Sequence, residues 1–200
     1  MADPTMRAAT HADLDLILRE LRDVIMTSPH YSDRFKEHEA NRLDRAFLKG
    51  LLAIDPWHIM ISCVDGVPAG AIISGPECGA IFRYWSWVFP SHRQSKLALF
   101  GMRTFDEKWD NTRFHKAYTY VRPENEIARM LLKRYGYRET ALLEQHIFGQ
   151  DYLLIEKFYT RPDVPYDSGY VGLLSEAGAV MLTEGRATIA NALVMRRALT

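Results

Sequence analysis

The residues from Trp85 to Met102, WSWVFPSHRQSKLALFGM, combine features that could bind phosphate. The stretch begins as an apolar, aromatic run, turns at Pro90 and continues as a basic, polar loop over residues 91–96. A helical pattern of apolar residues begins at Leu97. At a helix N-terminus the first backbone N–H groups lack partners within the helix, and the helix dipole is positive there. The sequence therefore predicts an anion-binding site at this strand–loop–helix junction.

The composition argues against several other kinds of site. The 25 basic and 25 acidic residues give no net charge, which disfavours nucleic-acid binding driven by bulk charge. Cys63 and Cys78 have neither metal nor redox spacing, and the seven histidines form no zinc motif. No run reaches the roughly 18 apolar residues that cross a bilayer, and the polar N-terminus is atypical of a signal peptide. We expect a cytoplasmic protein without metal, membrane or nucleic-acid partners.

Upstream of the loop, the pattern predicts one strand, two helices and an antiparallel meander of three strands. Thr10 and Asp13 resemble a capping box that opens the first helix. Asp65-Gly66 is a turn signal between the first two meander strands, and Gly75-Pro76 and Cys78-Gly79 mark the next turn. The predicted elements are strand 6–10, helices 14–25 and 32–55, and strands 57–64, 67–74 and 80–89.

Downstream of the loop, the pattern predicts two further helices and three strands. Gly136 is well placed to end the second of these helices. The composition changes after Arg161-Pro162, so we divide the chain into a domain, 1–160, and a C-terminal appendage of helical character, 161–200. The predicted elements are helix 95–109, strand 114–121, a helix from Pro123 to Gly136, and strands 137–143 and 150–158. The predicted fold class is α/β, of the α+β type, with a mixed and mostly antiparallel sheet flanked by helices.

Two motifs in this order resemble the GCN5-related N-acetyltransferase (GNAT) superfamily. The first motif is similar to the family pattern V-x-P-x-x-R/Q-x-x-G-x-G/A, with Val88, Pro90, Arg93 and Ala98 at matching positions. Lys96 stands where the family has its first glycine. The second motif spans 125–137 and is similar to N-x-x-A-x-x-L-Y-x-K/R-x-G-F. With the flanking strands, the resemblance covers residues 5 to 158.

The resemblance implies a GNAT fold in which two central parallel strands, 80–89 and 114–121, splay apart and hold acetyl-CoA between them. Backbone groups near Val88 would bind the pantetheine arm, and the loop amides would form a nest for the pyrophosphate. Lys96 adds a Cβ and a positive charge where the family has glycine. The cofactor-binding residues implied for domain 1–160 are Trp87, Val88, Phe89, Arg93, Gln94, Ser95, Lys96, Leu97, Ala98 and Asn125.

Catalytic residues are less evident from the sequence. The family often has a tyrosine at the position of Leu132, where it protonates the departing CoA thiolate, and leucine lacks this proton. Strand 80–89 contains no carboxylate or histidine. The nearest candidate for a general base is Glu77, which lies just before this strand. Tyr120 could approach the site from the next strand, and Ser86 could orient a water. Glu77, Tyr120 and Ser86 are therefore the catalytic candidates, although packing roles for Tyr120 and Ser86 are equally compatible with the sequence.

The aromatic residues of strand 80–89 could form an acceptor pocket, and strand alternation would place about half of them on each face of the sheet. The resemblance implies an N-acetyltransferase that acts on the primary amine of a small molecule or a protein. The alternative is a catalytically degenerate GNAT-fold interaction protein. The internal virion proteins of T7-like phages resemble such domains, so a virion location is included in this alternative. Residues 161–200 could then serve as a homo-oligomer or assembly contact.

Overall fold

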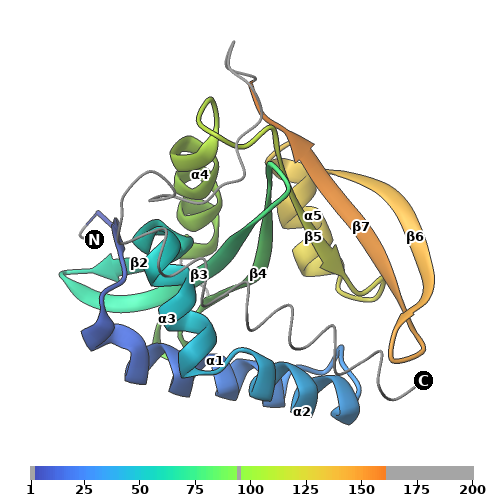
Figure 1. Ribbon diagram of the computed structural model, residues 1–200, viewed down its shortest axis with the longest axis horizontal. Helices are drawn as coiled ribbons and strands as arrows, with labels where there is room; N and C mark the ends of the chain where they lie inside the picture. The colour runs from blue at the N-terminus through green and yellow to red at the C-terminus, as the bar shows by residue number, and fades with distance from the viewer. Residues whose placement is uncertain (1–2, 94–95, 161–200) are drawn as a thin grey trace, which may run out of the picture. The chain divides into compact units, whose positions relative to one another are not determined.

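The computed structural model describes residues 3–93 and 96–160, so the predicted appendage at 161–200 lies outside the described residues. The described strands form one seven-stranded sheet in the order β1-β2-β3-β4-β5-β7-β6 (Figure 1). Its strands are β1 (Thr5–Ala8), β2 (Ile59–Val64), β3 (Val67–Glu77), β4 (Ala80–Val88), β5 (Lys116–Val121), β6 (Arg138–Ile147) and β7 (Gln150–Phe158). The helices are α1 (Leu14–Thr27), α2 (Asp33–Arg42), α3 (Arg45–Ile54), α4 (Leu97–Trp109) and α5 (Glu126–Arg134), with short 3-10 turns at His11–Asp13, Pro56–His58 and Pro90–His92.

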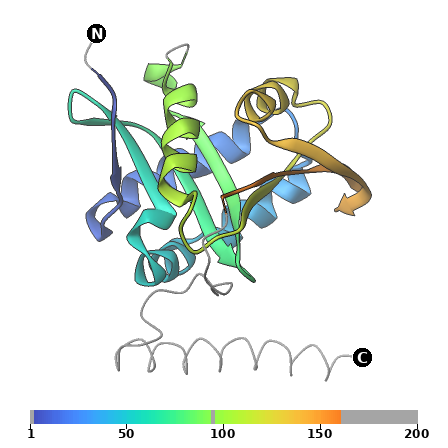
Figure 2. The same cartoon turned by 90° about the horizontal axis from the view of Figure 1, so that it is seen from above.

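Helices cover both faces of the sheet, and each face has its own core. One core joins α1 and α3 to alternate residues of β2 and β3, such as Ile59, Ile61 and Ile73. The other joins α4 and α5 to the intervening residues, such as Met60 and Ile72. Figure 2 shows α4 and α5 on one side of the sheet and α3 on the other. The predicted mixed sheet with flanking helices is confirmed, because every neighbouring pair is antiparallel except β4 and β5.

The single second helix that was predicted over 32–55 is wrong, because the segment forms two helices. The chain leaves helical geometry at Leu43, whose φ and ψ are −87° and 53°. Asp44 then accepts a hydrogen bond from Phe47 N at 2.8 Å and caps α3. An acidic residue at this position competes for backbone N–H groups and starts a new helix. The Ser32 cap of α2 is present, with Ser32 Oγ accepting from Phe35 N.

Of the two turn signals expected after β3, Gly75-Pro76 is wrong, because β3 runs on to Glu77. The other, Cys78-Gly79, is confirmed, because both residues have positive φ and lie between β3 and β4. Proline has no N–H to donate to a ladder, and Pro76 lies beyond the part of β3 that pairs with β2, which ends at Ile73. The predicted end of α5 is confirmed at Gly136, which has φ 82° and donates its N–H to Lys133 O.

Strands β4 and β5 pair over a short length only. Their parallel ladder runs from Ala80 with Lys116 to Phe82 with Tyr118, and the strands then diverge (Figure 1). One further contact follows, from Thr119 Oγ1 to the carbonyl of Arg83 at 2.9 Å. From there to Val88 the β5-facing edge of β4 has no strand partner. The splayed parallel pair predicted from the family resemblance is therefore present.

A β-bulge next to the splay changes which residues of β4 face each core. The register with β3 shifts between Ile73 and Ser74, which pair with Trp85 and Arg83, so Tyr84 is the extra residue. As a result, Tyr84, Trp85 and Trp87 all pack against the α1–α3 core. The expectation that alternation divides these aromatics between the two faces is therefore wrong. Among the described residues, no helix is long and apolar enough to cross a membrane.

We predict that Gly70 is needed for the fit between β3 and β4. A Cβ there would lie 2.7 Å from Trp87 O and 2.8 Å from Ser62 Oγ, and 3.3 Å from the Cα of Val88. Gly70→Ala should lower the free energy of unfolding by about 1–3 kcal/mol, measured by chemical denaturation. Gly50→Ala is the matched control because nothing lies within 4 Å of its Cβ position in α3. That change should instead add about 0.5–1 kcal/mol, and equal effects at the two glycines would contradict the prediction.

We predict a pH-dependent contribution from Asp13, which anchors the start of α1 to β1. Its carboxylate accepts two hydrogen bonds from Arg7, at 2.7 and 2.8 Å, and one from Thr10 N at 2.8 Å. The hydrogen bonds from Arg7 hold the pKa of Asp13 well below its usual range. Because the unfolded chain then binds more protons at acid pH, this stabilisation is present above about pH 4 and fades as the pH falls below it.

Asp13→Asn should therefore cost about 1 kcal/mol of unfolding free energy at pH 7 and less at pH 3. Denaturation curves at the two pH values measure the difference. Asp23→Asn, at an exposed position of α1, is the control and should change stability little at either pH. A cost for Asp13→Asn that does not vary with pH would refute the proposed linkage.

Candidate active site

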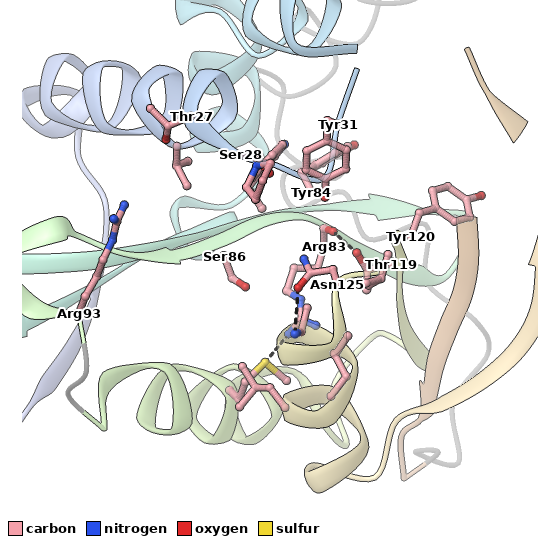
Figure 3. A pocket seen from close by; sticks show the side chains of 18 residues that line it. Thr27, Ser28, Tyr31, Arg83, Tyr84, Ser86, Arg93, Thr119, Tyr120 and Asn125 are labelled. Atoms are coloured by element: carbon pink, nitrogen blue, oxygen red, sulfur yellow. Dashed lines mark hydrogen bonds between the residues drawn. The ribbon is translucent and has the colours of Figure 1, made fainter. Parts of the chain in front are cut away.

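The gap between β4 and β5 opens into a cavity of about 450 Å³. Figure 3 shows side chains from both sides of the sheet around it, including Tyr31 from the loop after α1 and Asn125 at the start of α5. We call this the splay cavity. Two arginines, Arg83 and Arg93, line it, and no Asp or Glu is among its described lining residues. Its electrostatic character therefore favours an anionic ligand.

A second cavity, of about 160 Å³, lies between the C-terminal half of β4 and the first turns of α4. Four of the predicted cofactor-binding residues line it: Trp87, Val88, Leu97 and Ala98. It shares Ser86, Met102 and Leu131 with the splay cavity. The two cavities thus form a path from the start of α4 along the unpaired edge of β4 to the point where the strands separate.

The other predicted cofactor residues differ in their surroundings. Phe89 is buried, and its N–H donates to Ala69 O at 2.8 Å, so its backbone is already used by β3. Lys96 is exposed immediately before α4, and its carbonyl accepts from Phe100 N. Asn125 caps α5, with its side-chain oxygen accepting from Ala128 N at 3.2 Å, and also lines the splay cavity. Gln94 and Ser95 lie outside the described residues.

A third cavity, of about 300 Å³, lies on the α1–α3 face and is rich in aromatic side chains. We call it the aromatic cavity. It shares Tyr31, Tyr84, Trp85, Thr119 and Tyr120 with the splay cavity, so the two meet at the gap in the sheet. Two carboxylates, Glu39 and Glu77, also line it. The remaining described lining residues are Phe35, His38, Arg42, Phe82, Ile147, Phe148 and Tyr152.

The two carboxylates of the aromatic cavity have different partners. Glu39 is buried, accepts two hydrogen bonds from Arg42 at 2.8 and 2.9 Å, and accepts a third from Trp85 Nε1 at 2.9 Å. Glu77 is exposed and accepts a hydrogen bond from the Tyr118 hydroxyl at 2.6 Å. No ion pair of Glu77 is found among residues 3–93 and 96–160. Glu77 is therefore the carboxylate available to take a proton or to bind a cation.

The predicted catalytic residues are not gathered at one point. Glu77 lines the aromatic cavity, Ser86 lines the splay and second cavities, and Tyr120 lines both the aromatic and the splay cavity. Burial, and then the neighbouring Glu77, raises the pKa of Tyr118 and of Tyr120 above the ordinary phenol value. Both phenols are therefore neutral at physiological pH and can donate, rather than accept, a proton. Leu132, at the family's tyrosine position, lines the splay cavity with an apolar side chain.

The sequence reasoning missed three contributors to the site. Arg83 was treated only as part of an aromatic strand, although a single charge among apolar strand residues was a usable signal. Tyr31 lies in a loop. Its ring stacks on that of Phe35, with 4.5 Å between the ring centroids, and meets the ring of Trp85 edge-on, with 5.6 Å between the centroids. Glu39 belongs to a charged helix in which nothing in the sequence sets it apart from its neighbours. Among the described residues, no group of His, Cys, Asp and Glu side chains could hold a metal ion.

Comparison with known proteins gives structural neighbours only. A scan against protein-family models found no match, and a search of the curated proteins also found none. Among solved structures, Ard1 from Thermoplasma volcanium superposes with a TM-score of 0.61 at 17% identity, covering 78% of this chain and 98% of Ard1. The structure of yncA from Salmonella typhimurium with its cofactor acetyl-CoA superposes with a TM-score of 0.61 at 16% identity. The match covers 81% of this chain and 97% of yncA.

A third neighbour is a GNAT superfamily phosphinothricin acetyltransferase from Sinorhizobium meliloti in complex with acetyl-CoA. Its TM-score is 0.61 at 12% identity, and the match covers 84% of this chain and 96% of that protein. These matches span nearly the whole of each neighbour, and at such low identity they show the fold alone. Together with the mixed sheet and the splay between β4 and β5, they show that the described part of this chain has the GNAT fold, in a divergent form.

Proposed function

We propose that the protein is an N-acetyltransferase that transfers an acetyl group from acetyl-CoA to a primary amine. The observation that carries the proposal is the short β4–β5 ladder, beside which a cavity lined by two arginines and a cavity lined by Glu39 and Glu77 share five wall residues. Such an arrangement would let a donor and an acceptor meet from opposite faces of the sheet. Two of the structural neighbours contain acetyl-CoA, which supports this choice of donor.

The residues along the path fit a CoA thioester. Val88 and Ala98 line the narrow second cavity, where a slender, largely neutral arm fits between β4 and α4. The first turn of α4 and Arg93 supply positive charge for phosphate groups at the start of this path. When bound, the thioester supplies an activated acetyl group. The unpaired edge of β4 supplies backbone groups that can polarise the thioester carbonyl.

The acceptor amine would occupy the aromatic cavity. Glu77 is placed to take up the proton that the amine loses, directly or through a water, while the Tyr118 hydroxyl holds the carboxylate in position. In the transfer, a nitrogen–carbon bond forms, the carbon–sulfur bond breaks, and one proton moves from the amine to CoA overall. Tyr120 lines both cavities and has a raised pKa, so it is a neutral donor close to the reacting groups. The acceptor is an amine of a small molecule or a protein, in the cytoplasm.

We predict that acetyl-CoA binds at micromolar strength and raises the melting temperature. At a ligand concentration about 100 times Kd, the stabilisation should be about 2.7 kcal/mol. Ala98→Glu should abolish the shift, because a carboxylate in the first turn of α4 repels phosphate while favouring the helix itself. Ala53→Glu, an exposed site on α3 across the sheet, is the charge-matched control and should bind normally. Absence of any shift at millimolar acetyl-CoA would refute the proposed donor.

Lys96 is a separate test of the phosphate loop. Lys96→Gly removes the Cβ that stands where the family has glycine, so we predict tighter acetyl-CoA binding by calorimetry. Weaker binding would instead assign the Lys96 ammonium to a phosphate contact.

We predict that Glu77→Gln lowers kcat/KM for a primary amine by about 100-fold or more and leaves the Kd for acetyl-CoA unchanged. The reason is that the amide keeps the shape of the side chain but is not a base. Glu144→Gln, at an exposed position of β6, is the control and should behave like the original protein. Undiminished turnover by Glu77→Gln would remove Glu77 from the mechanism and leave Tyr120 or a substrate-borne base.

A GNAT-fold interaction protein without catalysis is the second candidate. The observation that favours it is the apolar side chain of Leu132 in the splay cavity, where the family has an acid for the leaving thiolate. Binding of acetyl-CoA without turnover of any amine would support this candidate. Its phage-virion form stays a prediction, which neighbouring tail and head genes would test.

A further inference from the structure

The splay cavity contains a buried positive charge that forms no ion pair with any residue in the described part of the chain. Arg83 is only 5% exposed, and the hydrogen bond of its guanidinium that the structure shows goes to the thioether of Met102 (Figure 3). The rings of Phe105 and Tyr137 lie 5.5 and 5.3 Å from its Cζ. A thioether is a weak acceptor, and ring faces only partly replace the lost hydration of a guanidinium. Burying a cation on these terms is costly unless an anion joins it.

The neighbouring acid does not serve as that anion. Asp106 accepts from Lys157 at 2.7 Å and from the hydroxyls of Tyr137 and Tyr159 at 2.8 and 3.1 Å. Its charge is therefore matched by Lys157. No ion pair involving Arg83 is found among residues 3–93 and 96–160, and the described wall of the splay cavity has no carboxylate. The missing partner is thus expected in the cavity itself.

The position of Arg83 along β4 indicates which part of a ligand it would meet. A ligand entering from the start of α4 passes Val88 first and then Ser86, in the second cavity. Ser86 also borders the splay cavity, and Arg83 comes last, where the β4–β5 ladder begins. Because of the bulge at Tyr84, Arg83 lies on the same face of the sheet as Ser86 and Val88. The end of the ligand that reaches deepest is therefore the end that meets the guanidinium.

We propose that the acyl donor carries a carboxylate, as in the CoA thioester of a short dicarboxylic acid such as malonyl- or succinyl-CoA, and that Arg83 pairs with that carboxylate. This inference rests on the proposed acyltransferase function and replaces its neutral acetyl group with an anionic acyl group. The bond changes are the same: the amine nitrogen bonds to the thioester carbon, the carbon–sulfur bond breaks, and the distal carboxylate is carried over unchanged. Arg83 then sets donor specificity.

Calorimetric titration of the full chain with acetyl-CoA and with succinyl-CoA tests the proposal. The unaltered protein should bind succinyl-CoA about tenfold or more tightly than acetyl-CoA. Arg83→Gln should bring the ratio of the two Kd values close to one while acetyl-CoA still binds. Arg103→Gln, an exposed arginine on α4 whose partner is Glu107, is the matched control and should keep the preference.

A ligand-side control covers the case in which Arg83→Gln does not fold. The methyl ester of succinyl-CoA has nearly the same length without the charge, so the unaltered protein should bind it no better than acetyl-CoA. Equal binding of acetyl- and succinyl-CoA by the unaltered protein would overturn the proposal and leave the acetyltransferase function intact. If Arg83→Gln weakened the binding of acetyl-CoA and of succinyl-CoA equally, the proposal would also be overturned. Arg83 would then contribute to the shape of the cavity or to a part that all CoA thioesters share, and not to recognition of the carboxylate. Failure of every CoA thioester to bind would overturn the proposed function as well.

Discussion

The site depends on one feature of the sheet, the early end of the β4–β5 ladder. Parallel pairing stops at Phe82 and Tyr118, and the last contact uses the Thr119 hydroxyl on the Arg83 carbonyl. Beyond that point the backbone of β4 is paired on one side by β3 and faces the gap on the other. A continuous ladder would fill the gap with main-chain hydrogen bonds and close the connection between the two faces. The unpaired edge is tolerable only where a ligand or water can take the place of a strand.

The bulge at Tyr84 gives the two faces of this gap different chemistry. The extra residue places Tyr84, Trp85 and Trp87 on the α1–α3 face and keeps Arg83 on the α4–α5 face. The cavity on one face is consequently aromatic, with Glu39, Glu77 and Arg42 in its described wall, and the described wall of the splay cavity has two arginines and no carboxylate. A donor with negative charge and an acceptor with positive charge would thus be drawn to opposite sides of one opening. This separation is a property of register, since one residue fewer in β4 would exchange the faces.

Contacts distant from the gap hold its walls in place. The Glu39 carboxylate ties α2 to β4 through Trp85 Nε1, and Arg42 balances its charge. On the other face, Asp106 joins α4 to β7 through Lys157 and to the segment between α5 and β6 through Tyr137. Both carboxylates are buried and fully engaged, so they act as fixed links between elements. Because both are engaged in this way, neither Glu39 nor Asp106 is free to pair with Arg83 or with a ligand.

Much of this architecture could be predicted from the sequence because its signals are local. Helical spacing located α1, α4 and α5, and Gly136 marked the end of α5. The errors came where two local signals competed. Asp44 could sit inside a helix or cap a new one, and Pro76 could end a strand or lie on its free edge. In each case the outcome depended on neighbours elsewhere in the chain.

The sequence by itself determined most of the order of the elements, the strand–loop–helix junction before α4 and the likeness to the GNAT fold, because these depend on residue spacing and turn residues that are local in the chain. Only the tertiary structure decided which charges are left unpaired. Glu39 is one of several charges on its helix and Arg83 is a single charge on its strand, and neither pattern shows the partners: Glu39 binds Arg42 and Trp85, whereas Arg83 contacts a thioether and two rings. Partners of this kind come from distant segments, and the bulge that directs Arg83 into the cavity exists only once β3 and β4 are in register.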